Sequence, residues 1–131
     1  MKKNKKLLIA GNWKMNGLKK NSLMISNLMK YIKNKKFKNT DILICPPFTI
    51  ANIFSTLSKK SNLMIGAQNC SDKVSGAFTG DISPEMLKDI DLEMVIIGHS
   101  ERREYHNETS EIVKSKAINA LKNKLNVIIC V

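Results

Sequence analysis

The chain has 131 residues, of which 43% are hydrophobic and 25% charged, a composition typical of one ordinary globular domain without disorder. Because 22 Lys and Arg stand against 11 Asp and Glu, the formal net charge is +11 and a nucleic-acid partner has to be considered. Aromatic residues make up only 5%, no RNA-stacking or helix-turn-helix signature appears, and the lysines mostly fall where helices face water. We therefore expect no nucleic-acid partner.

The amino end resembles a signal peptide only in its basic start, since the apolar run at 7–11 is interrupted by Asn12 and Lys14. No apolar stretch is long enough to cross a membrane, so we expect no membrane partner and a cytoplasmic location.

The cysteines are odd in number, widely spaced and placed in or beside apolar runs, which is typical of buried free thiols in a reducing compartment. They are Cys45, Cys70 and Cys130. His99 and His106 have no Cys or His companion at ligand spacing, so we expect no metal site.

Short apolar runs recur along the chain and each predicts a buried strand. They lie at 7–11, 41–47, 63–69, 93–99 and 126–131. Helical patterns fall between them, because apolar residues follow the i, i+4, i+7, i+8 spacing of one helix face. The two predicted faces are Met24, Leu28, Tyr31 and Ile32, and later Val113, Ala117, Ala120 and Leu121. Ser83 and Pro84 predict an N-cap and first turn for a short helix through Ile90.

This alternation predicts an α/β fold with a parallel sheet, either doubly wound or part of a barrel. The first strand is followed by "GNWKMNG", without the glycine-rich turn of a dinucleotide-binding unit. A (β/α)₈ barrel needs about 250 residues, so four βα units and one further strand correspond to roughly half of one. We expect residues 1–131 to form a single, partial barrel domain.

Three polar residues are predicted at carboxyl ends of strands, where loops of α/β folds carry ligand sites. Asn12 and Lys14 are two apart, so in extended backbone both face one side and Trp13 the other. His99 lies between a strand and the helix start at Ser100. A cation, an amide and an imidazole suit polarisation of a carbonyl in a phosphorylated substrate. A solvated lysine and a structural, hydrogen-bonded histidine are the alternatives.

Five motifs resemble the triosephosphate isomerase family, in the right order and over nearly the whole chain. They are "AGNWKMN" (10–16), "CPPF" (45–48), "GAQN" (66–69), "GAFTGDIS" (76–83) and "VIIGHSERR" (95–103). The resemblance implies the (β/α)₈ TIM barrel, of which this chain supplies the first four βα units and strand five.

The family's catalytic residues can be placed on this sequence by these motifs. Lys14 matches the lysine that binds the substrate's negative charge, and Asn12 the substrate-binding asparagine beside it. His99 matches the neutral imidazole that polarises the carbonyl; this family is itself the standard illustration of a helix amino end keeping such a ring neutral. Glu101 matches the acid that accompanies the lysine, although an exposed acid in a first helical turn looks the same.

The loop at 68–83 matches the family's dimerisation loop, which reaches into a neighbouring subunit. Thr79 matches the threonine that orders the partner's active site, and Met15 is expected to face the incoming loop. Asp81 stands where a glutamate is common, and Cys130 matches a structural cysteine.

The family's general base follows the sixth strand, and its lid and main phosphate-binding loops come later still, all beyond Val131. We expect no substitute here, because Glu104, Glu108 and Glu111 are predicted on the helix after strand four.

The resemblance implies a homodimeric isomerase that interconverts dihydroxyacetone phosphate and D-glyceraldehyde 3-phosphate through an enediol in glycolysis and gluconeogenesis, without a cofactor. Residues 1–131 alone are expected to be inactive. The alternatives are a non-catalytic half-barrel interaction module, a decayed gene product, and a basic RNA-binding domain with steeply salt-dependent binding.

Overall fold

The structure is a computed structural model that describes residues 6–35, 37 and 39–131. It contains five strands: β1 (Leu7–Asn12), β2 (Thr40–Cys45), β3 (Leu63–Ala67), β4 (Met94–Ile97) and β5 (Asn126–Ile129). Its helices are the short 3₁₀ helix η1 (Lys19–Asn21), α1 (Ser22–Lys35), α2 (Phe48–Ser58), α3 (Pro84–Asp89), α4 (Ser100–Tyr105) and α5 (Ser110–Lys122). All five strands form where they were predicted, although β2, β3, β4 and β5 each end two residues earlier than expected and β1 ends one residue later. The expectation that every strand is buried is wrong for the two edge strands, because each has only one neighbour in the sheet: β1 is mostly exposed, and β5 is exposed or half-buried.

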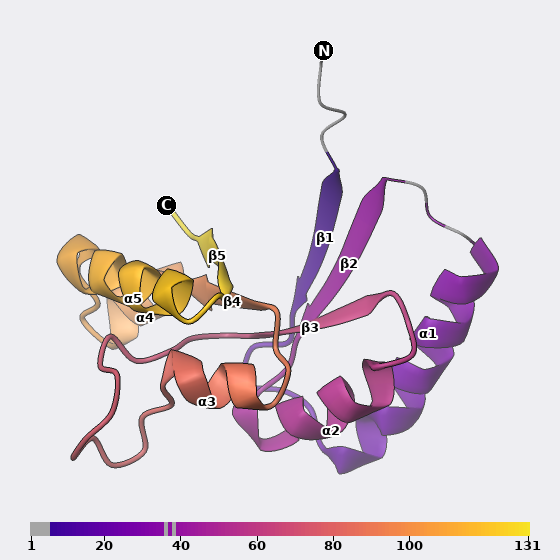
Figure 1. The fold of residues 1–131 in the computed structure, drawn as a ribbon, viewed down its shortest axis with the longest axis horizontal. Helices are drawn as coiled ribbons and strands as arrows, with labels where there is room; N and C mark the ends of the chain where they lie inside the picture. Colours follow the sequence, from indigo (N-terminus) through magenta and orange to yellow (C-terminus); the bar gives the residue numbers. More distant parts are fainter. Residues whose placement is uncertain (1–5, 36, 38) are drawn as a thin grey trace.

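The strands form one sheet in the order β1-β2-β3-β4-β5, and each pairs in parallel with the next (Figure 1). Sequential parallel strands connected through helices form the first half of a (β/α)₈ barrel, which confirms the predicted fold class. None of the helices in the described ranges is long and apolar enough to cross a membrane.

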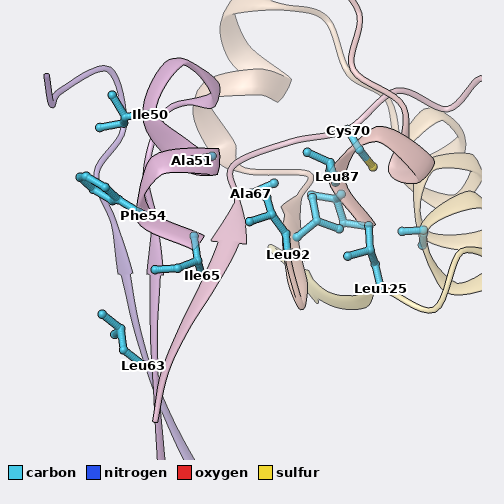
Figure 2. Packing of buried hydrophobic residues seen from close by; sticks show 14 of the residues in the cluster. Ile50, Ala51, Phe54, Leu63, Ile65, Ala67, Cys70, Leu87, Leu92 and Leu125 are labelled. Carbon is cyan, nitrogen blue, oxygen red and sulfur yellow. The ribbon is translucent and has the colours of Figure 1, made fainter. Parts of the chain in front are cut away.

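Alternation along the strands supplies two apolar layers. One layer lies between the sheet and the helices, and Figure 2 shows Phe54 and Ala51 of α2 packing beside Ile65 of β3. The second layer contains strand residues and Cys130, which directly follows β5, but no helix residues, so it lies on the opposite face of the sheet. Its members are Leu43, Cys45 and Ile96, with Met64, Met94, Ile128 and Cys130 packed against them.

The predicted helix faces are partly wrong. In α1 the residues buried in the core are Ile25 and Ile32, whereas Met24 and Tyr31 are 51% and 52% exposed. The helix is rotated toward Ile25 because this residue packs into the layer that contains Ile50 and Phe54. On α5, Val113, Ala117 and Ala120 are buried as predicted, but Leu121 is 56% exposed.

The turn after β4 leads directly into α4, as predicted, but the helical region then breaks. Backbone turns at 106–109, with Asn107 at φ 54°, separate α4 from α5. Thr109 caps the new helix, because its hydroxyl accepts a hydrogen bond from the backbone N–H of Ile112 at 3.3 Å. The expectation that Glu108 lies on a continuous helix is therefore wrong.

Ser83 caps α3 as the sequence predicts. Its hydroxyl accepts a hydrogen bond from the backbone N–H of Met86 at 3.3 Å, and Pro84 occupies the first helical turn. All three cysteines are free, but only Cys45 and Cys70 are buried as expected, whereas Cys130 is half-buried. Burial raises the pKa of Cys45 to about 12. Burial also raises the pKa of the Cys70 thiol, to about 11, although the nearby Lys116 ammonium acts in the opposite direction.

Candidate active site

The carboxyl ends of β1, β3 and β4 meet at one edge of the sheet because neighbouring strands are parallel. Asn12 ends β1, Gln68 follows β3, and His99 follows β4 as the N-cap of α4. The structure thus brings together four of the predicted site residues: Asn12, Lys14, His99 and Glu101.

The expectation that Asn12 and Lys14 face the same side required an extended backbone through Lys14. The backbone is not extended at this residue. Lys14 is left-handed, with φ 54°, and its N–H donates to Asn12 Oδ1 at 2.9 Å. A lysine in this region is strained, and such strain concentrates at functional sites. Trp13 does point elsewhere, since its ring packs edge-on against Phe54 at 5.2 Å between centroids.

Gln68 holds the strained turn in place. Its Nε2 donates to the carbonyl oxygen of Lys14 at 2.8 Å and to that of Cys45 at 2.9 Å. The backbone N–H of Trp13 also donates to Cys45 O, at 3.1 Å. These contacts anchor the Lys14 backbone to the ends of β2 and β3. Sequence reasoning missed them, although Gln68 belongs to the motif "GAQN" at the end of a predicted strand.

Lys14 and Glu101 form an ion pair across the site. Lys14 Nζ donates to Glu101 Oε1 at 2.7 Å, and the side chains are 54% and 44% exposed. The hydrogen bond from Lys14, together with the charge of its ammonium, lowers the pKa of the Glu101 carboxyl against its partial desolvation. The carboxylate therefore stays ionised and fixes the ammonium near the histidine.

The imidazole of His99 has one nitrogen occupied by the backbone. Its Nδ1 accepts a hydrogen bond from the N–H of Glu101 at 3.2 Å, so this nitrogen carries no proton. Glu101 Oε2 lies 3.4 Å from the same Nδ1, a contact that would be an ion pair only with a protonated ring. The hydrogen bond assigns a neutral ring with its proton on Nε2, free to donate to a ligand.

The remaining predicted site residues lie apart from this cluster. Met15 is 97% exposed, and Thr79 is exposed in the loop 68–83, which extends from the body of the molecule (Figure 1). Neither side chain forms a hydrogen bond with any described residue. Asp81 keeps the base of the loop closed, because it accepts a hydrogen bond from Ser71 Oγ at 2.8 Å.

A buried ionic cluster behind the site is not anticipated by the sequence analysis. Glu108 Oε1 accepts hydrogen bonds from Lys116 Nζ and Arg102 Nε, and Lys116 also donates to Asn69 Oδ1 at 2.9 Å. Burial by itself would raise the pKa of Glu108, but the two hydrogen bonds outweigh it and the pKa is lowered. Thr109, a typical N-cap residue next to Ser110, is the sequence signal that could have revealed the helix break.

Within the described ranges, no three His, Cys, Asp or Glu side chains are grouped so that they could hold a metal ion. The arrangement instead offers an ammonium, an amide and an imidazole N–H. These donors can stabilise negative charge that develops on oxygen atoms of a ligand.

Comparison with known proteins gives a consistent result. Residues 7–131 match the family model described as triosephosphate isomerase. Triosephosphate isomerase from Alkaliphilus oremlandii is 44% identical over 128 residues, which are 97% of this chain and 50% of that protein. The protein of the same name from Rhizobium etli is 44% identical over 124 residues, 95% of this chain and 48% of its own length.

The crystal structure of triosephosphate isomerase from Bartonella henselae superposes with a TM-score of 0.88 at 37% identity, over 96% of this chain and 51% of that one. The chain spans about half the length of the curated relatives it matches. The family match over residues 7–131, the half-barrel and the strand-end cluster agree: the chain belongs to the triosephosphate isomerase family.

Proposed function

We propose that the full-length protein is a triosephosphate isomerase, which interconverts dihydroxyacetone phosphate and D-glyceraldehyde 3-phosphate through an enediolate without a cofactor. The observation that supports this most directly is the grouping of Lys14, Glu101 and His99 at one sheet edge, with the imidazole Nδ1 occupied by a backbone N–H. The step belongs to glycolysis and gluconeogenesis. We propose a cytoplasmic location, because free thiols are typical of proteins in a reducing compartment.

In this proposal Lys14 binds the substrate's negative charge and Asn12 fixes the turn that presents the ammonium. A carboxylate removes a proton from the carbon next to the carbonyl, and the electron pair moves onto the carbonyl oxygen. His99 donates its Nε2 proton to that oxygen and takes a proton from the neighbouring one. The second carbonyl then forms as the carboxylic acid returns its proton to the carbon that carried the first, which regenerates the carboxylate. Glu101 is bonded to Lys14, so it orients the ammonium and does not act as the base.

We further propose that residues 1–131 are part of one barrel domain, and that the protein is a homodimer in which Thr79 of the loop 68–83 orders the partner's site and Met15 faces the incoming loop.

The test is a turnover assay of the full-length protein with D-glyceraldehyde 3-phosphate, followed by the appearance of dihydroxyacetone phosphate. Lys14→Met provides the matched inactive protein, so that contaminating isomerase is measured in the same preparation. Equal rates for the two proteins would refute the proposed function.

A further inference from the structure

Arg103 joins three elements beneath the candidate active site. Its Nε donates to the carbonyl oxygen of Gly98 at 2.9 Å, and Nη2 donates to that of Cys130 at 3.3 Å. Nη1 donates to Ser110 Oγ at 3.3 Å. The guanidinium therefore ties the turn after β4 to the residue after β5 and to the first residue of α5. Its partners among the described residues include no carboxylate.

Only a planar guanidinium can serve these acceptors together. A lysine ammonium is a single point of donation on a flexible stem and cannot reach acceptors spread over three elements. The fit is also close, because a Cβ at Gly98 would lie 3.0 Å from Arg103 Nη2 and 2.9 Å from Val113 Cγ1. Gly98 has φ +67°, so the residue before His99 combines a conformation that favours glycine with space that only glycine leaves free.

Gly98 is also the point at which His99 could move. On the carboxyl-terminal side of His99 the backbone is fixed by α4, because the N–H groups of Arg102 and Arg103 donate to His99 O at 2.8 and 3.1 Å. On the amino-terminal side, the peptide that enters His99 carries the Gly98 carbonyl, and the side-chain bond to it comes from Arg103. Without that bond, the flexible glycine would let the peptide rotate and loosen the contact between Glu101 N–H and His99 Nδ1.

We propose that Arg103 is a positioning residue that fixes the orientation and the single neutral tautomer of the His99 imidazole through the Gly98 carbonyl. The inference rests on the proposed function for its catalytic meaning. If Arg103 had a purely structural role, it would tie β4 to β5 and α5, and replacing Arg103 would not change the orientation or the tautomer of the His99 ring.

The test is ¹⁵N NMR of histidine rings in the full-length protein carrying Arg103→Lys, with His99 assigned by its absence from His99→Gln. The unmodified protein should show two well-separated His99 resonances, an unprotonated Nδ1 and a protonated Nε2. In Arg103→Lys the two should move toward each other as the tautomers interconvert. The matched control is Arg102→Lys, because Arg102 bonds Glu108 and not Gly98, and it should leave both resonances in place. A folded Arg103→Lys with an unchanged His99 spectrum would overturn the proposal.

A second measurement covers an Arg103→Lys variant that fails to fold. In the unmodified protein, exchange of the Arg103 Nε proton and the separation of the His99 resonances are followed together on warming below the unfolding transition. Their loss over the same range supports the coupling, whereas free exchange at Nε with an unchanged ring refutes it.

Activity separates this inference from the function on which it rests. A misplacement of His99 should lower kcat on the order of 10²-fold in Arg103→Lys. If the His99 resonances change in Arg103→Lys but the unmodified protein never isomerises a triose phosphate, the positioning role of Arg103 stands and the proposed function is refuted. If the unmodified protein is active but the His99 resonances do not change in Arg103→Lys, the proposed function stands and the positioning role is refuted.

Discussion

Lys14 combines an unfavourable backbone conformation with a side chain that is ion-paired at the candidate site. Its replacement should therefore affect turnover much more than stability, since the residue is exposed and Gln68 holds the turn through backbone atoms. We predict that Lys14→Met lowers kcat/KM by about 10²–10³-fold, the cost of one donor to developing charge. Lys20→Met, at another exposed lysine without an ion pair in the described chain, should change neither kcat/KM nor the unfolding midpoint.

The importance of Lys14 could be predicted from the sequence, but its conformation could not. The motif "GNWKMN" places the residue at a strand end, which is a local property. The left-handed turn depends on Gln68, which is 54 positions away and bonds the backbone of Lys14 and Cys45. A periodicity rule that continues the strand has no access to such a contact.

At the scale of elements, the break between α4 and α5 buries Glu108 between two cations. Removing one partner of a buried ionic cluster leaves the others unpaired, which costs about 3–5 kcal/mol. We predict that Glu108→Gln lowers the free energy of unfolding by that amount at neutral pH, measured by urea denaturation. Glu111→Gln is the control, because Glu111 is 85% exposed and its loss should stay within about 0.5 kcal/mol.

The pH dependence of Glu108 has a definite sign. Its folded-state pKa is lowered from an ordinary value of 4.5, so it stabilises the fold above that pH and the contribution is lost as pH falls through the folded-state pKa. As the pH is lowered from neutral through the folded-state pKa of Glu108, the free energy of unfolding should fall more in the unmodified protein than in Glu108→Gln. Parallel acid losses in the two proteins would show that Glu108 is not the group that titrates.

The strands and the order of elements were predictable because buried parallel strands appear as apolar runs whatever their partners. The helix faces were predictable only in part: Ile32 of α1 and Val113 of α5 are buried as expected, but Met24 is not. Ile25 and Met24 are adjacent apolar residues, and only packing on Ile50 and Phe54 decides which one is buried. Glu108 was missed because its burial depends on Lys116 from the following helix.

At the scale of the molecule, the loop 68–83 presents apolar side chains to solvent, with Val74 62% and Phe78 44% exposed. A subunit interface would cover them. We predict that the full-length protein sediments as the proposed dimer, and that deleting residues 73–79 converts it to a monomer. Leu121→Ser, which removes an equally exposed apolar residue from α5, should leave the dimer intact; a deletion variant that still sediments as a dimer would place the interface elsewhere.

A polypeptide of residues 1–131 should be inactive by itself. Proton abstraction needs a carboxylate within about 2.6–3.2 Å of the reacting group. The carboxylate at the described strand ends is that of Glu101, and it already accepts a hydrogen bond from Lys14. The purified polypeptide is assayed with D-glyceraldehyde 3-phosphate, and turnover above that of its Lys14→Met variant would show that a residue present here acts as the base.

The central claim, that His99 is the acid–base imidazole of an isomerase, is tested most directly by kcat of the full-length protein with His99 or His106 replaced by glutamine. The two residues lie at opposite ends of α4, as its N-cap and C-cap, and of the two it is His99 that contacts Glu101, the partner of Lys14. We predict that His99→Gln lowers kcat by about 10²–10³-fold while His106→Gln retains the original rate. Equal rates for the two variants would contradict the assignment.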